Sequence, residues 1–190
     1  MKFKLFLALF IVFSFKAFSQ TKNNISVLYG INSDPVNIHD AIGDYGYETR
    51  SGTVAGVMYT RNIKKFFSLQ TGLIYSYDPV ELSTIEGGRG EFFHRGDVKA
   101  LSIPVYAKLT FFKYFYFDSG LSGDIQTNYY QNNGAIRNQS GLGGELGIGV
   151  QVPLGPAAVF VNAYTRQYNI TAYDNNLNEF GVKFGVGLNF

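Results

Sequence analysis

The feature that most limits how this chain can fold is a period of two in side-chain polarity, which is clearest in its last thirteen residues, NEFGVKFGVGLNF. Every second residue of that stretch is apolar, and the residues between are polar or glycine; the apolar set is Phe180, Val182, Phe184, Val186, Leu188 and Phe190. Successive side chains of an extended strand point to opposite faces. The stretch therefore predicts a strand with one apolar face and one polar or bare face.

The same alternation recurs along the chain in eight runs. They cover residues 24–32, 51–62, 67–78, 100–111, 115–126, 141–154, 158–168 and 179–190. The run at 51–62 is the weakest, because Val54 and Met58 fall opposite other apolar residues. No stretch has a convincing helical period. The sequence therefore predicts an all-β fold.

The connections between these runs alternate between short and long. The short ones lie at 62–66, 112–114 and 155–157, and the long polar ones at 33–50, 79–97, 129–140 and 169–178. In an up-and-down meander, successive connections lie at opposite ends of the sheet. All short turns then share one end with both termini, as in transmembrane barrels of the bacterial outer membrane. We predict an eight-stranded antiparallel up-and-down transmembrane β-barrel.

The composition of the polar face indicates which face meets which solvent. It consists mainly of Gly, Ser, Thr, Asn and Gln, and only 16% of the chain is charged, whereas a soluble surface carries about 25–35% charged residues. Small polar residues fit the narrow lumen of an eight-stranded barrel, so the apolar face is expected to contact outer-membrane lipid. A soluble periplasmic carrier of the lipocalin type, with the faces reversed, is the alternative.

Aromatic residues gather near the ends of the runs, as interfacial girdles do. They are Phe66, Phe67, Phe111, Phe112, Tyr114 and Phe115 beside the short turns, and Tyr75, Tyr77 and Tyr129 towards the long loops.

Charges of both signs lie on the polar face. The acids are Asp118, Asp124, Glu145 and Glu179, and the bases are Lys108, Arg166 and Lys183. An isolated charge in a tight lumen is very costly, so these groups are expected to pair and to form hydrogen bonds. Four acids and three bases nearly neutralise each other. This predicts a salt-bridged plug rather than an open pore.

The first residues have the pattern of a signal peptide. A basic start at Lys2 and Lys4 precedes an apolar run of h-region length, and Ala17 and Ser19 have the small-residue spacing of a cleavage site. We predict a signal peptide at 1–19 and a barrel domain at 20–190; a retained N-terminal anchor is the alternative. Without residues 1–19, 13 basic residues face 14 acidic ones, so nothing favours a nucleic-acid partner. The absence of cysteine excludes acylation and disulfides.

Several of these strands together resemble a known family. The stretches FFSLQTGLIYSY, LSIPVYAKLTFF followed by YFYFDSGLSGDI, and GVKFGVGLNF are similar to the PorT-like outer-membrane β-barrel family of Bacteroidetes. The resemblance implies a place in the bacterial outer membrane. The terminal Phe190 resembles the signal by which such proteins reach the barrel assembly machinery. Some relatives belong to the type IX secretion apparatus, so a component of or accessory to such an apparatus is an alternative role for this chain. The family offers no catalytic residues to carry over.

Enzymatic chemistry has little support in the sequence. The histidines are His39 and His94, both in expected long loops. Some small outer-membrane barrels modify lipid A with a His, a Ser and an acid at the rim, and His94 has Glu91, Asp97 and Ser102 near it in sequence. Nothing in the sequence fixes their geometry. We expect no enzyme, but a structural or interaction protein that presents its long loops to a surface ligand or partner protein.

Two further motifs have simpler readings. The Arg-Gly-Asp triplet at 95–97 would lie in the second long loop, where so short a match is most often coincidence. In GLGGELGIG the glycines fall within an alternating strand, whereas a dinucleotide site needs a helix after them; Gly147 and Gly149 more simply leave room in the lumen. No pattern predicts a metal or another cofactor.

Overall fold

The computed structural model describes residues 23–33, 45–49, 51–85, 91–128, 139–170 and 178–190. These residues form the strands β1 (Asn23–Ser33), β2 (Tyr45–Thr49), β3 (Ser51–Lys64), β4 (Phe67–Ile85), β5 (Glu91–Phe111), β6 (Phe115–Gln126), β7 (Gly141–Leu154), β8 (Ala157–Gln167) and β9 (Asn178–Asn189). The expected signal peptide at 1–19, His39 and Tyr129 lie outside the described residues.

In the described part of the chain, no helix is long and apolar enough to cross a membrane.

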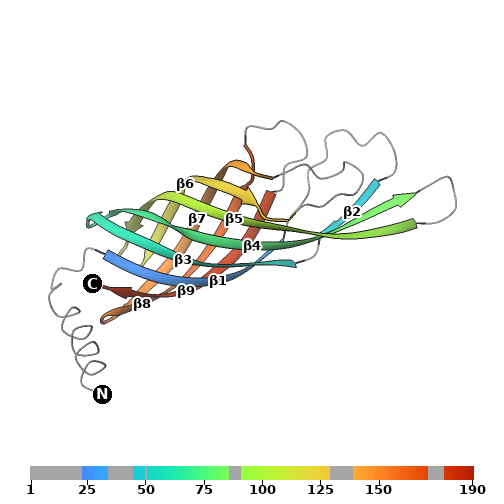
Figure 1. Cartoon of the computed structure of the whole chain (residues 1–190). Helices are drawn as coiled ribbons and strands as arrows, with labels where there is room; N and C mark the ends of the chain where they lie inside the picture. The colour runs from blue at the N-terminus through green and yellow to red at the C-terminus, as the bar shows by residue number, and fades with distance from the viewer. Residues whose placement is uncertain (1–22, 34–44, 50, 86–90, 129–138, 171–177) are drawn as a thin grey trace, which may run out of the picture.

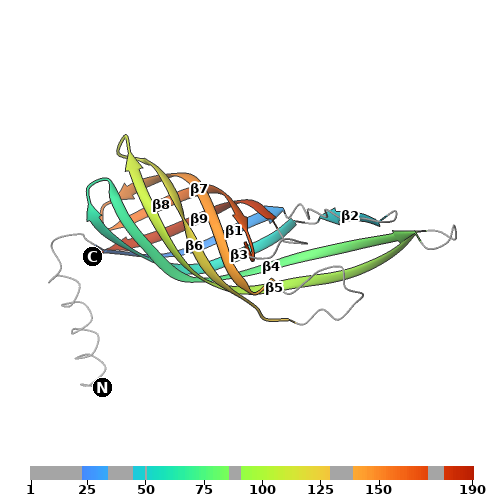
Figure 2. The ribbon, with the colours of Figure 1, turned by 90° about the horizontal axis from the view of Figure 1, so that it is seen from above.

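Eight of the strands close into a barrel in the order β1, β3, β4, β5, β6, β7, β8, β9, and β9 returns to β1 (Figures 1 and 2). Every neighbouring pair is antiparallel. The prediction of an eight-stranded antiparallel up-and-down barrel is confirmed.

The register of the strands sets the tilt of the barrel. One circuit of paired residues runs Ser33, Phe180, Thr165, Leu146, Ser119, Ala107, Leu69, Arg61 and Asn23. The circuit starts at Ser33 and returns to β1 at Asn23, so the shear is 33 minus 23, or 10 residues. With usual strand spacings, eight strands at this shear tilt by about 40° to the barrel axis. Such a barrel is narrow enough for side chains to fill it.

Short turns and the chain's C-terminus share one end of the barrel. Residues 65–66, 112–114 and 155–156 connect β3 to β4, β5 to β6 and β7 to β8. Phe112, Lys113 and Gly155 have positive φ angles there, as tight turns require. At the same end, the backbones of Asn23 and Phe190 exchange two hydrogen bonds of 3.1 and 3.0 Å, which complete the closure.

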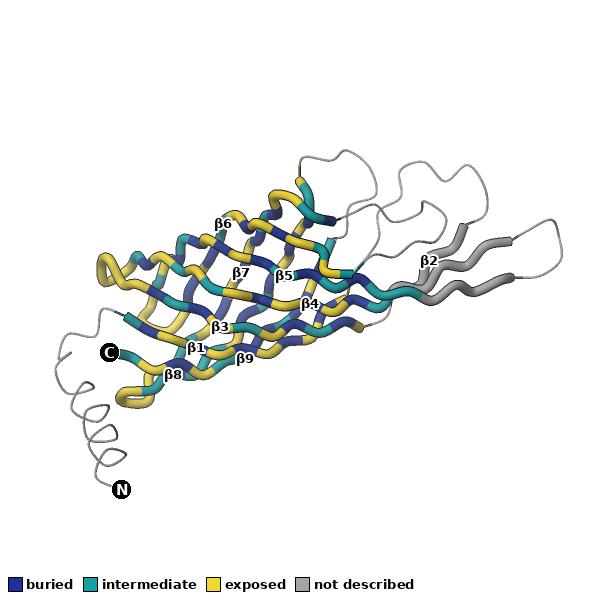
Figure 3. The backbone as a smooth tube through the Cα atoms, viewed as in Figure 1, coloured by how far each residue is buried: buried dark blue, intermediate teal, exposed yellow. Residues whose placement is uncertain are grey.

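Burial alternates along the barrel strands, as Figure 3 shows. In β1, Ser26 and Leu28 point inward and are buried, while Ile25, Val27 and Tyr29 point outward and are exposed. The lumen is not uniformly polar, however. A small apolar cluster fills part of it, formed by Leu28, Val54, Met58, Ile74, Tyr106 and Tyr164.

The segment 79–97, expected as a long loop, is instead mostly a pair of strands. β4 continues to Ile85 and β5 begins at Glu91, and the two stay in register to their ends. β2 pairs with β4 beyond Val80, so three strands leave the barrel together (Figures 1 and 2). Pro79 suggested a loop because proline lacks an N–H. It lies between the last β3 pair at Tyr77 and the first β2 pair at Val80, where no ladder needs that donor.

Candidate functional site: the lumen and the protruding sheet

All seven charged residues predicted for the lumen point into it, and each is at most 7% exposed. They are Lys108, Asp118, Asp124, Glu145, Arg166, Glu179 and Lys183. An eighth charged residue, Asp78, is also fully buried and accepts a hydrogen bond of 2.7 Å from Asn32. Sequence reasoning placed Asp78 on the polar face of its run but omitted it from the network, because the run was expected to end there. The continuation of β4 is what keeps it inside.

Arg166 organises the half of the lumen nearer the long connections. Its guanidinium, from β8, forms an ion pair with Asp124 on β6. The same nitrogen donates to the hydroxyls of Ser102, at 2.5 Å, and Ser122, at 3.1 Å. The guanidinium carbon lies 4.5 Å from the centre of the Tyr168 ring. These contacts join β5, β6 and β8 across the lumen.

A second ion pair lies deeper in the barrel. Lys183 on β9 donates to Glu145 on β7 at 2.6 Å, and the Tyr106 hydroxyl on β5 donates to the other oxygen of Glu145 at 2.8 Å. The Lys183 ammonium also lies 3.7 Å from the centre of the Tyr164 ring. This cluster connects opposite walls of the barrel, so its partners lie far apart in the sequence.

The other predicted charges have neutral partners among the described residues. Asp118 accepts from Asn162 at 3.2 and 3.3 Å. Lys108 donates to Gln151 at 2.5 Å and lies 3.8 Å from the centre of the Tyr116 ring.

Glu179 accepts from Tyr168 at 2.8 Å and also from Tyr164. The described lumen therefore combines two ion pairs with hydrogen bonds from amides and phenols. The charges that the sequence placed in the lumen are held both by ion pairs and by hydrogen bonds to neutral side chains.

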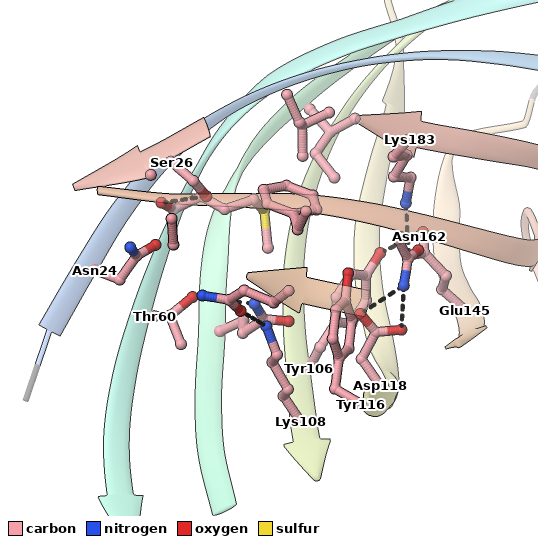
Figure 4. A pocket seen from close by; sticks show the side chains of 18 residues that line it. Asn24, Ser26, Thr60, Tyr106, Lys108, Tyr116, Asp118, Glu145, Asn162 and Lys183 are labelled. Atoms are coloured by element: carbon pink, nitrogen blue, oxygen red, sulfur yellow. Dashed lines mark hydrogen bonds and ion pairs between the residues drawn. The ribbon is translucent and has the colours of Figure 1, made fainter. Parts of the chain in front are cut away.

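Among the described residues, the lumen side chains leave a cavity of about 30 Å³ towards the short-turn end. Figure 4 shows its lining, with Asn24, Ser26 and Thr60 on one side and Asp118, Glu145 and Lys183 on the other. That volume holds about two water molecules. A Cβ on Gly147 would lie 2.1 Å from an oxygen of Asp118, and one on Gly149 would lie 2.4 Å from the Tyr116 ring. These glycines leave room for lumen side chains, as predicted.

The outer wall carries an apolar band. Its exposed side chains include Val27, Leu73, Val105, Leu121, Leu146, Ile148, Val161, Phe184 and Val186. The aromatic residues expected beside the short turns are on the outside there; Phe112 is 85% exposed, and Phe66, Phe111, Tyr114 and Phe115 are exposed as well. Cations sit at the same end, at Arg61, Lys64, Lys65 and Lys113. The band is thus bordered by aromatic and basic side chains, as at a membrane interface.

At the opposite border of the band, Lys99 forms an ion pair with Asp97 at 2.7 Å. Its ammonium lies 5.6 Å from the centre of the Tyr77 ring. The hydrogen bond and the charge of Asp97 raise the pKa of Lys99. This half-buried pair lies where β4 and β5 leave the barrel.

The protruding sheet consists of β2, the end of β4 from Pro79 to Ile85, and the beginning of β5 from Glu91 to Asp97. The Arg-Gly-Asp triplet lies in β5, with Gly96 opposite Val80 and Asp97 opposite Pro79, so its expected position in a loop is wrong.

His94 and Ser102 lie on the same strand, eight residues apart, which corresponds to about 26 Å. Ser102 contacts Arg166 in the lumen. The His94–Ser102 pair considered in the sequence therefore cannot act as base and nucleophile together. Among the described residues, no group of three or more His, Cys, Asp or Glu side chains could hold a metal ion.

A closed antiparallel barrel with an apolar outer wall and a filled polar lumen is the architecture of small outer-membrane proteins. No protein-family model matches the chain, and no curated protein matches it in sequence. Among solved structures, the outer-membrane protein AlkL in DMPC bilayers aligns over 90% of both chains at 10% identity, with a TM-score of 0.56.

Two further solved structures align with lower scores. OprG from Pseudomonas aeruginosa covers 90% of this chain and 97% of its own at 15% identity, with a TM-score of 0.47. Ail of Yersinia pestis, in complex with the heparin analogue sucrose octasulfate, covers 89% and 99% at 14% identity, with a TM-score of 0.42. The likeness to AlkL concerns the fold. This chain is a small eight-stranded β-barrel of the outer-membrane type.

Proposed function

We propose that this protein is a closed anchor in a bacterial outer membrane that presents its protruding sheet and long connections to a surface ligand or partner protein. The observation that carries the proposal is the length of two strands. β4 has 19 residues and β5 has 21, whereas a tilted strand crosses a bilayer with about 9–11. The surplus is paired sheet on the side away from the short turns.

The side chains that fill the lumen favour a binding role for this protein rather than a role in transport. Two buried ion pairs and the rings of Tyr106, Tyr116 and Tyr164 occupy the interior. Keeping so many polar groups satisfied fixes the shape of the barrel. A rigid, filled barrel suits a platform better than a channel, and the proposal gives the chain no catalytic role.

The family and the route to the membrane belong to the same proposal. The resemblance of the strand sequences supports membership in the PorT-like family of Bacteroidetes. Residues 1–19 would act as the export signal, and Phe190 would act in delivery to the barrel assembly machinery. Membrane fractionation of expressing cells, with N-terminal sequencing of the mature protein, tests both location and cleavage. Recovery in the soluble fraction without detergent would contradict the proposal.

The binding role is tested by removing the protruding sheet. In one variant an Asn-Gly turn replaces residues 81–95 and joins Val80 to Gly96, which face each other and direct their backbone groups at one another. The control places Asn-Gly at Gly155-Pro156, the tight turn at the opposite end. Both are compared with wild type in nanodiscs, after heat-modifiability gels establish that each barrel folds. The probes are a glycan array and a phage-displayed library of twelve-residue peptides.

We expect ligands that bind wild type and the turn control but not the shortened variant. Equal binding to all three proteins, or no specific binder to wild type, would contradict the proposed function.

A further inference from the structure

The protruding part of β5 has a described neighbour on one side only. Its residues pair with β4 down to Glu91, opposite Ile85. On its other side, β6 pairs with β5 no further than Ala100, opposite Gln126. Residues 91–96 of β5 therefore form a sheet edge within the described part of the chain. We call this stretch the β5 edge.

The hydrogen bonds at Lys99 tell which backbone groups point outward from that edge. The carbonyl of Lys99 accepts from the Thr127 N–H at 2.8 Å, on the side away from β4. Backbone N–H and C=O groups alternate in direction along a strand. Those of Glu91, Phe93 and Arg95 therefore point outward, and those of residues 92, 94 and 96 point to β4.

A peptide-like group already occupies the next position on this edge. The side-chain carboxamide of Asn128 accepts from the Lys99 N–H at 2.8 Å and donates to the Asp97 carbonyl at 2.5 Å. A carboxamide offers the same donor and acceptor as a backbone peptide group. The contact shows that the outward backbone groups of Asp97 and Lys99, directly next to the β5 edge, bind such a group. The outward groups of Arg95, Phe93 and Glu91 continue the same line at a spacing of about 6.6 Å.

We propose that the β5 edge binds an extended polypeptide segment of another protein, which adds as a strand next to β5. This deepens the proposed function and rests on it. A row of alternating donors and acceptors at two-residue spacing complements an extended backbone. An extended polypeptide presents one N–H and one C=O on the same side at every second residue, which matches this row. Backbone pairing supplies the affinity and extends the three-stranded sheet to four.

The first experiment measures hydrogen exchange of the backbone amides in the isolated full-length protein. The amides of Phe93 and Arg95 are expected to exchange fast, and those of His94 and Gly96 slowly, because only the second pair donates to β4. Protection of Phe93 and Arg95 in the isolated protein would mean that the chain covers its own edge, and the proposal would fall.

The second experiment separates backbone pairing from side-chain contacts at the same positions. The probe is a peptide selected on wild type from the twelve-residue library. Proline at Phe93 or Arg95 (F93P, R95P) removes an outward N–H and leaves the β4 ladder intact, since edge strands tolerate proline on their open side. The matched controls F93A and R95A keep the N–H. Heat-modifiability gels and exchange at His94 verify that the barrel and the hairpin remain folded.

The proline variants are expected to bind the peptide at least about tenfold more weakly, while the alanine variants stay within about twofold. Peptide binding should also slow exchange at Phe93 and Arg95. If the proline variants bind like wild type, or if the alanine variants lose binding as well, strand addition is wrong. If the variant lacking residues 81–95 still loses binding in that case, the proposed function stands and only this inference fails.

Discussion

Arg166 on β8 and Asp124 on β6 form a buried ion pair across the strand that separates them. Both side chains are almost completely buried, and Ser102 and Ser122 share the same guanidinium nitrogen. These contacts link β5, β6 and β8, of which only β5 and β6 are neighbours. They therefore connect more of the barrel wall than a contact between two adjacent strands would.

Replacing Arg166 by Met is expected to destabilise the barrel by about 3–5 kcal/mol, because it leaves the Asp124 charge buried without its cation. The double variant R166M/D124N should recover a large part of that loss. The free energy of unfolding in urea, followed by intrinsic fluorescence in lipid vesicles, measures both. Equal losses in the single and double variants would mean that the pair is not coupled.

Replacing Gly149 by Ala is expected to lower the free energy of unfolding by about 1–3 kcal/mol, because the added methyl group overpacks the lumen. A Cβ there would lie 2.4 Å from the Tyr116 ring and 2.5 Å from the Val161 carbonyl, and the backbone oxygen cannot move aside. Gly144 on the same strand is the control, since its nearest new contacts are at 3.9 Å. Its change to Ala should alter stability by less than about 0.5 kcal/mol. The same unfolding assay compares the two, and a similar loss in both would contradict the packing of the lumen.

Ile148 to Lys tests which solvent meets the outer wall. Ile148 lies in the middle of β7 and is 57% exposed, so a lysine there should cost about 2–4 kcal/mol in a bilayer. Val152, four residues nearer the short turn, should tolerate the same change at about 0–1 kcal/mol. Because the chain has no cysteine, a spin label on I148C reports the environment directly. Preferential collision with nickel chelates over oxygen would show water there and refute the membrane orientation.

The filled lumen predicts that the protein conducts no small solutes. Vesicles with the reconstituted protein should swell in isosmotic sugar no faster than protein-free vesicles, because the described cavity has only about 30 Å³. A general porin at the same density provides the positive control. Swelling at a porin-like rate would show that the lumen opens in the membrane.

Much of the barrel was predictable, because apolar and polar side chains alternate along a strand that has lipid on one side and the lumen on the other. The expected runs at 115–126 and 141–154 coincide with β6 and β7. Alternation also placed Lys108 and Glu179 inside. These features depend on the local sequence and on the two solvents.

The remainder depends on contacts between distant parts of the chain. The partner of Arg166 is set by the shear, which no single strand encodes. The inward Met58 and Ile74 belong to one cluster with Tyr164, which comes from the opposite wall of the barrel. The continuation of β4 past Pro79 requires β5 and β2 as partners, and the sequence around Pro79 alone reads as a turn.

The position of Pro79 also bears on how the protein meets its surroundings. There the register of β4 with the chain beside it shifts by one residue, because Tyr77 lies opposite Thr53 whereas Val80 lies opposite Thr49. Such a shift bends a sheet and increases its local twist. The outer sheet therefore leaves the barrel in a direction of its own while the hydrogen bonds of the barrel remain intact. The direction in which the outer sheet points is thus fixed at the rim, where the register changes.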